Sequence, residues 1–342
     1  PFCLSCKEQP IYWQQLQQDK VWTQNLNQYL ALSYTEQQDR AGFYPVPQQG
    51  LSPSLHSTYA ILTLLHSINV KVENSEQIME YLDSLQDERG AYTDSLMYAL
   101  NFNPPDETLQ VIELYTILGG KPNDTESTIR YLLSLQYEDG TFLINAEEGV
   151  TERENSVIRR ITLGTYSVVN SLLILGHRED IPDITVHTIV TEIERILASH
   201  DSYQELMNDD PWRLLGAIEL LAKIDSTLVS ERAREFFVYM SKEVVNLPPD
   251  MYVFPSRANR LLDIAGLLTL PEKERKELKA EIKEYYTDNV IQLQNISGGF
   301  GPEETVEPMT TRENVILMNR LGLSYPNFEK LMNEINNHRV EK

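Results

Sequence analysis

Two acidic pairs, Asp106–Glu107 and Asp209–Asp210, stand directly before apolar stretches of the chain. Paired carboxylates can supply a proton donor and a charged partner for acid–base catalysis. The same residues also suit the first turn of a helix, because acidic side chains are favourable at the positive end of the helix dipole. The prolines beside both pairs fit the first helical positions, where no N–H is needed. Both interpretations, catalytic acid and helix start, stay open.

Arginines gather near the helix predicted from Thr165. Guanidinium groups and helix N-termini are the groups that bind diphosphates, so Arg159 and Arg160 are candidate substrate-binding residues. The competing interpretation is salt bridging with glutamates of the same stretch. The arginines considered are Arg153, Arg159, Arg160, Arg257 and Arg260, and the glutamates are Glu147, Glu148, Glu152 and Glu154.

The cysteines give no sign of a metal site. Cys3 and Cys6 are the only two in the chain, whereas a structural zinc site needs four ligands. The sequence also lacks a glycine-rich phosphate loop, a serine nucleophile elbow and a His-Glu-x-x-His motif. We therefore predict neither a metal nor a cofactor.

A repeat of about 50 residues organises the elements that must position these side chains. Each clear copy runs through Leu-Gln to a glycine and then an aromatic residue, which is typical of a helix that ends in a tight turn. Clear copies are Tyr81–Tyr92, Tyr131–Phe142 and Asn289–Phe300, a looser one is Tyr29–Phe43, and degenerate ones are expected near Glu192–Leu206 and Phe236–Tyr252.

The repeats predict two kinds of helix. One kind is apolar on most faces, which indicates packing on more than one side, and the other is amphipathic and charged. The pattern favours an all-α fold, an α6/α6 double-ring toroid of about six helical hairpins, with an open superhelix as the alternative. Inner helices are predicted over Thr58–Ile68, Thr108–Leu118, Thr165–Leu175, Trp212–Ile224, Ala258–Leu268 and Thr311–Leu321, and outer ones over Glu231–Glu243 and Lys273–Asp288.

The repeat resembles that of the prenyltransferase and squalene-cyclase family, which includes class II terpene cyclases and the β subunits of protein prenyltransferases. Its signature is Leu-x-x-Leu-Gln, a glycine and an aromatic residue, then a Thr-headed apolar helix that ends in Leu-Gly. The resemblance covers 25–325, which we assign to a single toroid domain. Residues 1–24 would form an N-terminal extension with a first helix, and 326–342 a C-terminal helical tail.

The resemblance implies a central cavity that binds an isoprenoid, and class II cyclases protonate their substrate with an Asp-x-Asp-Asp motif. Asp106 falls on the proton-donor position of that motif, while Pro104 and Glu107 replace its first and last aspartates. Asp209 and Asp210 form a second acid candidate. Residues that would line the cavity or stabilise a carbocation through an aromatic face are His56, Tyr59, Tyr115, Tyr166 and Trp212.

Protein prenylation is a poor fit. The family mechanism needs zinc held by an Asp, a Cys and a His in the C-terminal repeats. No cysteine follows Cys6, and 289–324 contains no histidine. The sequence therefore lacks the zinc ligands.

The charge restricts the partners. Lys and Arg number 29 against 51 Asp and Glu, which gives a net charge of −22 over 342 residues. Such a chain repels nucleic acid and anionic membrane surfaces, although its acidic surface could meet a protein partner. The longest apolar runs are too short to span a membrane, and we expect a cytoplasmic location.

Three functions remain. The first is a terpene-cyclase-like toroid that binds an isoprenoid or other lipophilic ligand and acts as a class II cyclase. The second is a non-catalytic binding or interaction protein that retains the scaffold. The third, a carbohydrate-active toroid using Asp106 with Asp210, is disfavoured because sugar sites usually expose several tryptophans and the chain has only three.

Overall fold

The computed structural model describes most of the chain between Tyr34 and Leu323. Asp209, Arg153, both cysteines and the predicted terminal segments lie outside the described residues. The described ranges are 34–37, 40–43, 54–67, 72, 75–94, 103–145, 149–150, 154–207, 210–246, 250, 253–291 and 308–323.

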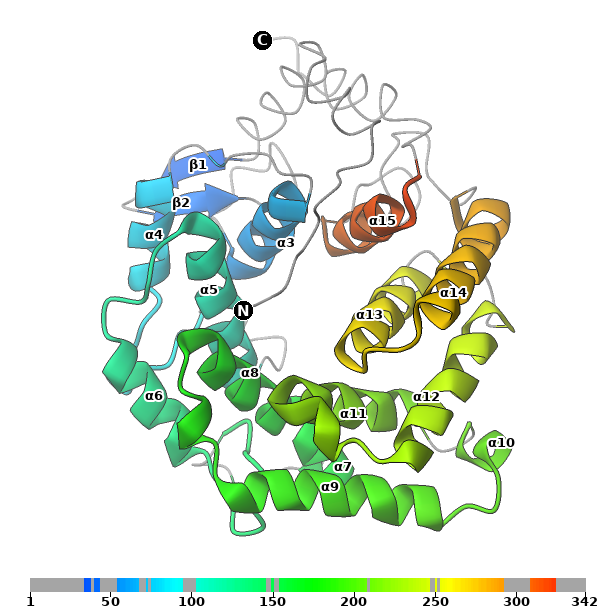
Figure 1. The fold of residues 1–342 in the computed structure, drawn as a ribbon. Helices are drawn as coiled ribbons and strands as arrows, with labels where there is room; N and C mark the ends of the chain where they lie inside the picture. Colours follow the sequence, from blue (N-terminus) through cyan, green and yellow to red (C-terminus); the bar gives the residue numbers. More distant parts are fainter. Residues whose placement is uncertain are drawn as a thin grey trace. The chain divides into compact units, whose positions relative to one another are not determined.

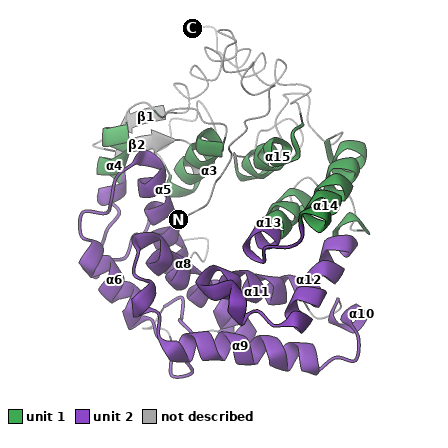
Figure 2. Cartoon of the chain, in the orientation of Figure 1, with its two compact units in different colours: residues 1–81, 244–262, 272–342 green, residues 82–243, 263–271 purple. Residues whose placement is uncertain are grey.

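The chain divides into two compact units (Figure 2). Unit 1 comprises 1–81, 244–262 and 272–342, and unit 2 comprises 82–243 and 263–271. Each unit is described by itself. The single toroid domain over 25–325 stays a prediction.

Unit 2 contains two layers of helices (Figure 1). The inner helices α5, α8 and α11 pack in chain order, α5 on α8 and α8 on α11, while α6 packs on α8 and α9 on α11. The elements are α5 (Pro104–Leu118), α6 (Thr125–Ser134), α7 (Val157–Arg160), the π-helical turn η3 (Ile161–Thr165), α8 (Tyr166–Leu175), η4 (Arg178–Asp180), α9 (Asp183–Ala198), α10 (Tyr203–Leu206), α11 (Pro211–Asp225), η5 (Ser226–Leu228) and α12 (Glu231–Glu243).

Burial follows the predicted division into inner and outer helices. In α11 every residue from Leu214 to Ala222 is buried, whereas α9 buries Thr185, Ile189, Glu192, Ile193 and Leu197, which repeat every three or four residues. That spacing places one apolar stripe of α9 on the layer beneath it. The end of α5 agrees with the sequence-based prediction. The helix stops at Gly119, whose φ of +77° is a conformation that glycine adopts without strain.

Unit 1 contains the first and last of the predicted inner helices. α15 packs along α3, and the Asn319 side chain donates a hydrogen bond to the Ser67 carbonyl at 2.7 Å. Within unit 1 this contact joins segments about 250 residues apart in sequence. The elements are β1 (Tyr34–Gln37), β2 (Arg40–Phe43), α3 (Leu55–Ser67), α4 (Ser75–Asp83, at the boundary of the units), η6 (Val244–Asn246), α13 (Val253–Leu267, whose last residues belong to unit 2), α14 (Glu272–Tyr285), η7 (Tyr286–Val290) and α15 (Pro308–Leu321).

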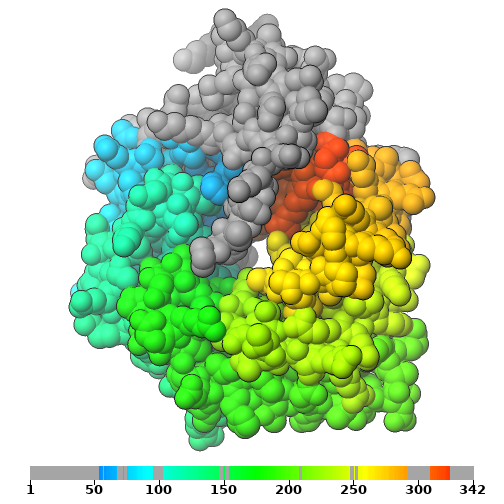
Figure 3. Space-filling view, viewed as in Figure 1, coloured from blue at the N-terminus to red at the C-terminus, as the bar shows by residue number. Residues whose placement is uncertain are grey.

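The all-α prediction is confirmed, and the six predicted inner helices correspond to α3, α5, α8, α11, α13 and α15. The number of hairpins in the ring stays a prediction. Among the described residues, the antiparallel pair β1–β2, with Tyr34 opposite Phe43, is the one strand element. α14 buries only Leu278 and Ile282, as expected for a solvated outer helix (orange in Figure 3).

Candidate functional site

Glu107 and Thr108 hold the loop that precedes α5. The Thr108 hydroxyl accepts a hydrogen bond from the Tyr92 N–H at 3.1 Å, and the Glu107 carboxylate accepts one from the Asp94 N–H at 2.7 Å. We call this arrangement of Glu107 and Thr108 with the backbone of Tyr92 and Asp94 the first clamp. All its polar partners are buried, so each bond satisfies a backbone donor that water does not reach.

The next repeat contains a second clamp of the same design. The Thr165 hydroxyl accepts from the Phe142 N–H and the Glu154 carboxylate from the Ile144 N–H, each at 2.8 Å. Glu154 and Thr165 are buried, like their counterparts in the first clamp. In both clamps a buried glutamate accepts a hydrogen bond from a loop N–H. This shared contact indicates a structural role for Glu107 and Glu154, which the sequence did not predict.

Glu107 is 4% exposed, and its carboxyl group has a shifted pKa. Burial, together with the negative charges of Asp94 and Asp106, raises the pKa of Glu107 to about 7, although the hydrogen bond from Asp94 acts in the opposite direction. At neutral pH the side chain therefore exchanges between a carboxylic acid and a carboxylate.

Asp106, the predicted proton donor, is half-buried on the first turn of α5. Its carboxylate accepts hydrogen bonds from Gln110 Nε2 at 3.1 Å and from the Ser167 hydroxyl at 3.4 Å. Asp106 thus lies between α5 and α8, while its neighbour Glu107 is directed at the loop.

Asp210, the described member of the second acidic pair, is exposed at the start of α11. Its carboxylate pairs with Arg213 Nε at 2.5 Å, and Arg213 also reaches the Thr162 hydroxyl at 3.3 Å. Asp210 does not cap the helix with its side chain, and it has a left-handed backbone with φ +52°. This arrangement fits a helix start better than a buried proton donor.

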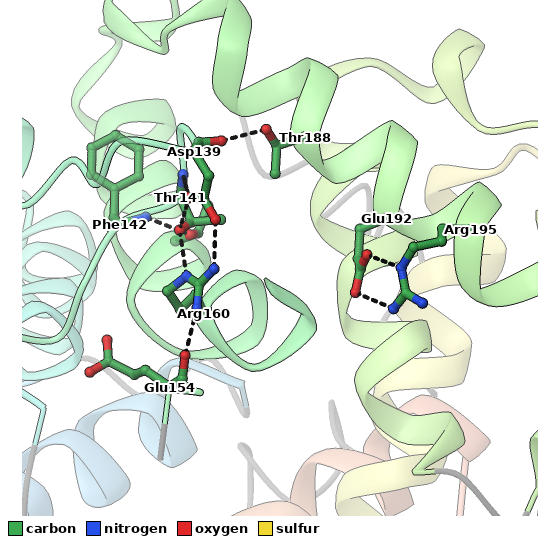
Figure 4. A network of polar contacts seen from close by, with 9 residues as sticks. Asp139, Thr141, Phe142, Glu154, Arg160, Thr188, Glu192 and Arg195 are labelled. Carbon is green, nitrogen blue, oxygen red and sulfur yellow. Dashed lines mark hydrogen bonds and ion pairs between the residues drawn. The ribbon is translucent and has the colours of Figure 1, made fainter. Parts of the chain in front are cut away.

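Arg160 connects α7 to the loop of the second clamp through buried hydrogen bonds (Figure 4). Its guanidinium donates to Asp139 Oδ2 at 2.6 Å, to the Thr141 hydroxyl at 3.0 Å and to the Glu154 carbonyl at 2.7 Å. It also lies over the Tyr137 ring, 5.3 Å from the centroid. Burial acts to raise the pKa of Asp139, but the hydrogen bonds from Thr141 and Arg160 prevail and lower it.

These contacts favour the salt-bridge interpretation for Arg160, with a partner that the sequence analysis did not name. Asp139 is 21 residues away in sequence, whereas Glu147, Glu148 and Glu152 lie outside the described residues. Arg159, the other predicted phosphate ligand, is half-buried in α7.

The tyrosines predicted to face a ligand have protein partners. Arg312 lies over the Tyr59 ring at 5.1 Å in unit 1, and Lys223 lies over the Tyr166 ring at 4.9 Å in unit 2. The Tyr166 hydroxyl donates to Glu219 at 2.8 Å and accepts from Lys223 at 3.0 Å. Burial acts to lower the pKa of Lys223, but the electrostatic interactions and hydrogen bonds with Tyr166 and Glu219 prevail and raise it.

The remaining aromatic and histidine candidates are dispersed. Tyr115 is buried and its hydroxyl donates to Asp83, and burial with this bond raises its pKa. Trp212 and His56 are half-buried in the first turns of α11 and α3. Asp106, Tyr166 and Arg213 thus lie on three inner helices of unit 2, whereas His56 and Tyr59 lie in unit 1.

Glu219 and Lys223 are functional-site candidates that the sequence analysis missed. Their ion pair at 2.8 Å has the i, i+4 spacing that stabilises helices, which is a readable signal within the predicted helix Trp212–Ile224. Both side chains are largely buried, at 6% and 18% exposure, whereas such pairs normally lie at the surface.

The part of the chain that the structure describes contains no group of three acidic, histidine or cysteine side chains placed to hold a metal. Within the same residues, no helix combines the length and apolarity that crossing a bilayer requires.

Comparison with protein families gives one match. The model of the prenyltransferase alpha-alpha toroid domain matches residues 12–101 and 108–215, which is more than half of the chain. The matched segments include α8 and Thr108 of the first clamp, whereas Asp106 and Glu107 fall between them. Neither a curated protein nor a solved structure matches the sequence. The chain belongs to the prenyltransferase alpha-alpha toroid family.

Proposed function

We propose that this protein binds an isoprenoid or a related lipophilic ligand that carries a polar head group, and that it does not cyclise the ligand. The observation that carries the proposal is a polar-to-apolar stripe along two inner helices of unit 2. Asp106, Gln110, Glu113 and Ile117 follow one another at helical spacing on α5 and are all half-buried, so this stripe is polar as far as Glu113 and apolar at Ile117. On α8 the half-buried residues change from Tyr166 at the start to Leu173 at the end.

Such a stripe suits an amphiphilic molecule. Polar side chains near the helix starts can hydrogen-bond a head group, and the apolar side chains farther along can contact a hydrocarbon chain. Membership of the family supports an isoprenoid as that hydrocarbon.

The acids support binding without cyclisation. Glu107 holds a loop, as Glu154 does in the next repeat, and Asp210 is exposed and ion-paired. Lys223 lies over the Tyr166 ring, so this face already meets a cation and is not free to stabilise a carbocation.

The test compares geranylgeraniol, which carries a polar head group, with squalene, which does not. We expect geranylgeraniol to raise the Tm of the purified protein more than squalene does, with no cyclic product by gas chromatography and mass spectrometry. Ile117→Gln should weaken the response to geranylgeraniol, and Thr116→Gln, at an exposed neighbouring position, should not. If neither geranylgeraniol nor squalene binds, the proposal is refuted.

The second candidate is a class II cyclase in which Asp106 is the proton donor. Its position in the motif and its half-buried carboxylate beside Ser167 favour it. A cyclic product that forms with the natural sequence and disappears in a folded Asp106→Asn variant would establish this activity in place of simple binding.

A further inference from the structure

Two buried asparagines of unit 1 differ in the hydrogen bonds of their side chains. On α15 both ends of the Asn314 amide are used, because Oδ1 accepts from the Tyr286 hydroxyl and Nδ2 donates to the Thr310 carbonyl, each at 2.8 Å. On α13 Asn259 uses Nδ2, which donates to the Glu313 carbonyl and to Glu313 Oε2, each at 3.0 Å. Asn259 is 6% exposed, yet no donor among the described residues reaches its Oδ1. Since buried acceptors are nearly always satisfied, this oxygen calls for a donor from outside the chain.

Glu313 fixes the orientation of the Asn259 amide. The reverse orientation would place Oδ1 against the Glu313 carbonyl and carboxylate, which are both acceptors. The backbone of Asn259 is also bonded to α15, because its carbonyl accepts from Arg320 Nη1 at 2.9 Å. The free end of the amide is therefore an oxygen held in place, and its partner must be an O–H or an N–H.

The charges beside this oxygen select a neutral donor. Arg312 donates to the Glu313 carboxylate and, through Nε, to the Thr63 hydroxyl of α3 at 2.6 Å. The Glu313 carboxylate and the amide oxygen together disfavour an anion, while the guanidinium of Arg312 disfavours a cation. The Arg312 and Glu313 side chains are 16% and 19% exposed, so solvent reaches this edge of the network although Asn259 is buried.

The rest of this neighbourhood suits a hydrocarbon. A buried water is typically held by about three hydrogen bonds. On α13 and α15, by contrast, the described side chains leave one buried acceptor open, which a single hydroxyl group satisfies. The two helices bury apolar side chains that include Ala258, Leu261, Val315, Leu317 and Met318.

We propose that unit 1 contains a binding site for a neutral lipophilic alcohol between α13 and α15 (Figure 1), in which Asn259 Oδ1 accepts the hydrogen bond of the ligand hydroxyl. Glu313 is a positioning residue that holds the amide, and Arg312 holds the Glu313 carboxylate. The site belongs to unit 1, whereas the stripe of α5 and α8 belongs to unit 2. The inference therefore goes beyond the proposed function, and either can fail without the other.

Photolabelling of the full chain with a linear, non-isoprenoid alcohol tests this site. A diazirine-bearing decanol is compared with its methyl ether, which has the same hydrocarbon but no O–H to donate, and labelled peptides are identified by mass spectrometry. We expect the alcohol to label the peptides covering 253–262 and 308–321 about tenfold more than the ether does, the factor of one hydrogen bond. Unlabelled decanol should compete, and decylammonium should not.

Asn259→Leu keeps the side-chain volume and removes the acceptor, so it should label equally with the two probes. Asn314→Leu is the matched control, because it also removes a buried amide of unit 1 but should keep the preference for the alcohol. Circular dichroism checks that each variant is folded. If Asn259→Leu does not fold, the comparison of the two probes in the natural sequence decides alone. Equal labelling by alcohol and ether in the natural sequence, or a preference that persists in folded Asn259→Leu, would overturn the proposal, as would competition by decylammonium.

Discussion

The two clamps reach the same hydrogen bonds from different sequences and in opposite electrostatic surroundings. The first uses adjacent residues, Glu107 and Thr108, and groups carboxylates. The second takes its glutamate from position 154, eleven residues before Thr165, and adds Arg160. The repeat therefore requires satisfied loop N–H groups, whereas the charges around them vary.

The largest expected effect separates the clamps by their charges. Arg160→Met should lower the free energy of unfolding by about 3 kcal/mol, since it removes the guanidinium that donates to the buried Glu154 carbonyl and to Asp139 Oδ2 and that balances the Asp139 charge. Chemical denaturation at neutral pH measures this change. Exchange of 137–144 should also accelerate more than that of 87–94.

The first loop provides the control for this substitution. Arg89 pairs with Asp87 at 2.9 Å, but its side chain is 51% exposed. Arg89→Met should cost less than about 1 kcal/mol, as measured for exposed pairs. Equal losses of unfolding free energy in Arg160→Met and Arg89→Met would contradict the conclusion that the buried contacts of Arg160 stabilise the second clamp.

A smaller effect tests what the clamps share. Thr108→Val and Thr165→Val each remove the acceptor of a buried loop N–H while keeping the side-chain volume. Each should lower the free energy of unfolding by about 1–3 kcal/mol, the cost of an unsatisfied buried donor. The two losses should agree within about 1 kcal/mol, since the bonds have the same partners and similar lengths.

The exposed Thr116 of α5 is the control for both threonine variants, because its hydroxyl bonds only a carbonyl of its own helix, that of Ile112. Thr116→Val should stay within about 0.5 kcal/mol of the natural sequence. A loss in Thr108→Val alone would show that the second loop is held by other contacts.

The inner helices and their ends could be predicted because apolar faces and Leu-Gly ends are local signals. The second clamp could not. Alignment of the helix ends places Gly164 opposite Glu107, and a Cβ at Gly164 would lie 2.3 Å from the Phe142 carbonyl oxygen, so no side chain fits there. The chain supplies the carboxylate from Glu154 instead and continues through α7 and the π-helical turn η3. Only the tertiary structure reveals that substitution.

The sequence predicted which residues belong to the candidate site better than it predicted what each of them contacts. Asp106 and Tyr166 were identified from the helix pattern, but their partners Ser167 and Glu219 come from neighbouring turns and helices. The pairing of Arg160 with Asp139 links a helix to a loop 21 residues earlier, a distance that no local pattern encodes. Isoprenoid binding, the cytoplasmic location and a protein partner for the acidic surface stay predictions.

The smallest expected effect concerns acid solution, in which the loop of the second clamp should lose protection and that of the first clamp should not. Because the hydrogen bonds from Thr141 and Arg160 lower the pKa of Asp139, its contribution to stability is present above the ordinary aspartate value and is lost as the pH falls through the lower folded value. The expected loss is on the order of 1 kcal/mol for this partly exposed pair. Between pH 5 and pH 3, normalised hydrogen exchange of 137–144 should accelerate while that of 87–94, held by protonated Glu107, should not. Asp139→Asn lacks the titrating group and should show weaker protection of 137–144 at pH 5 with little further change at pH 3. Parallel acceleration of both loops in the natural sequence would mean that acid acts on unit 2 as a whole, and the electrostatic contrast between the clamps would then have no consequence for their stability.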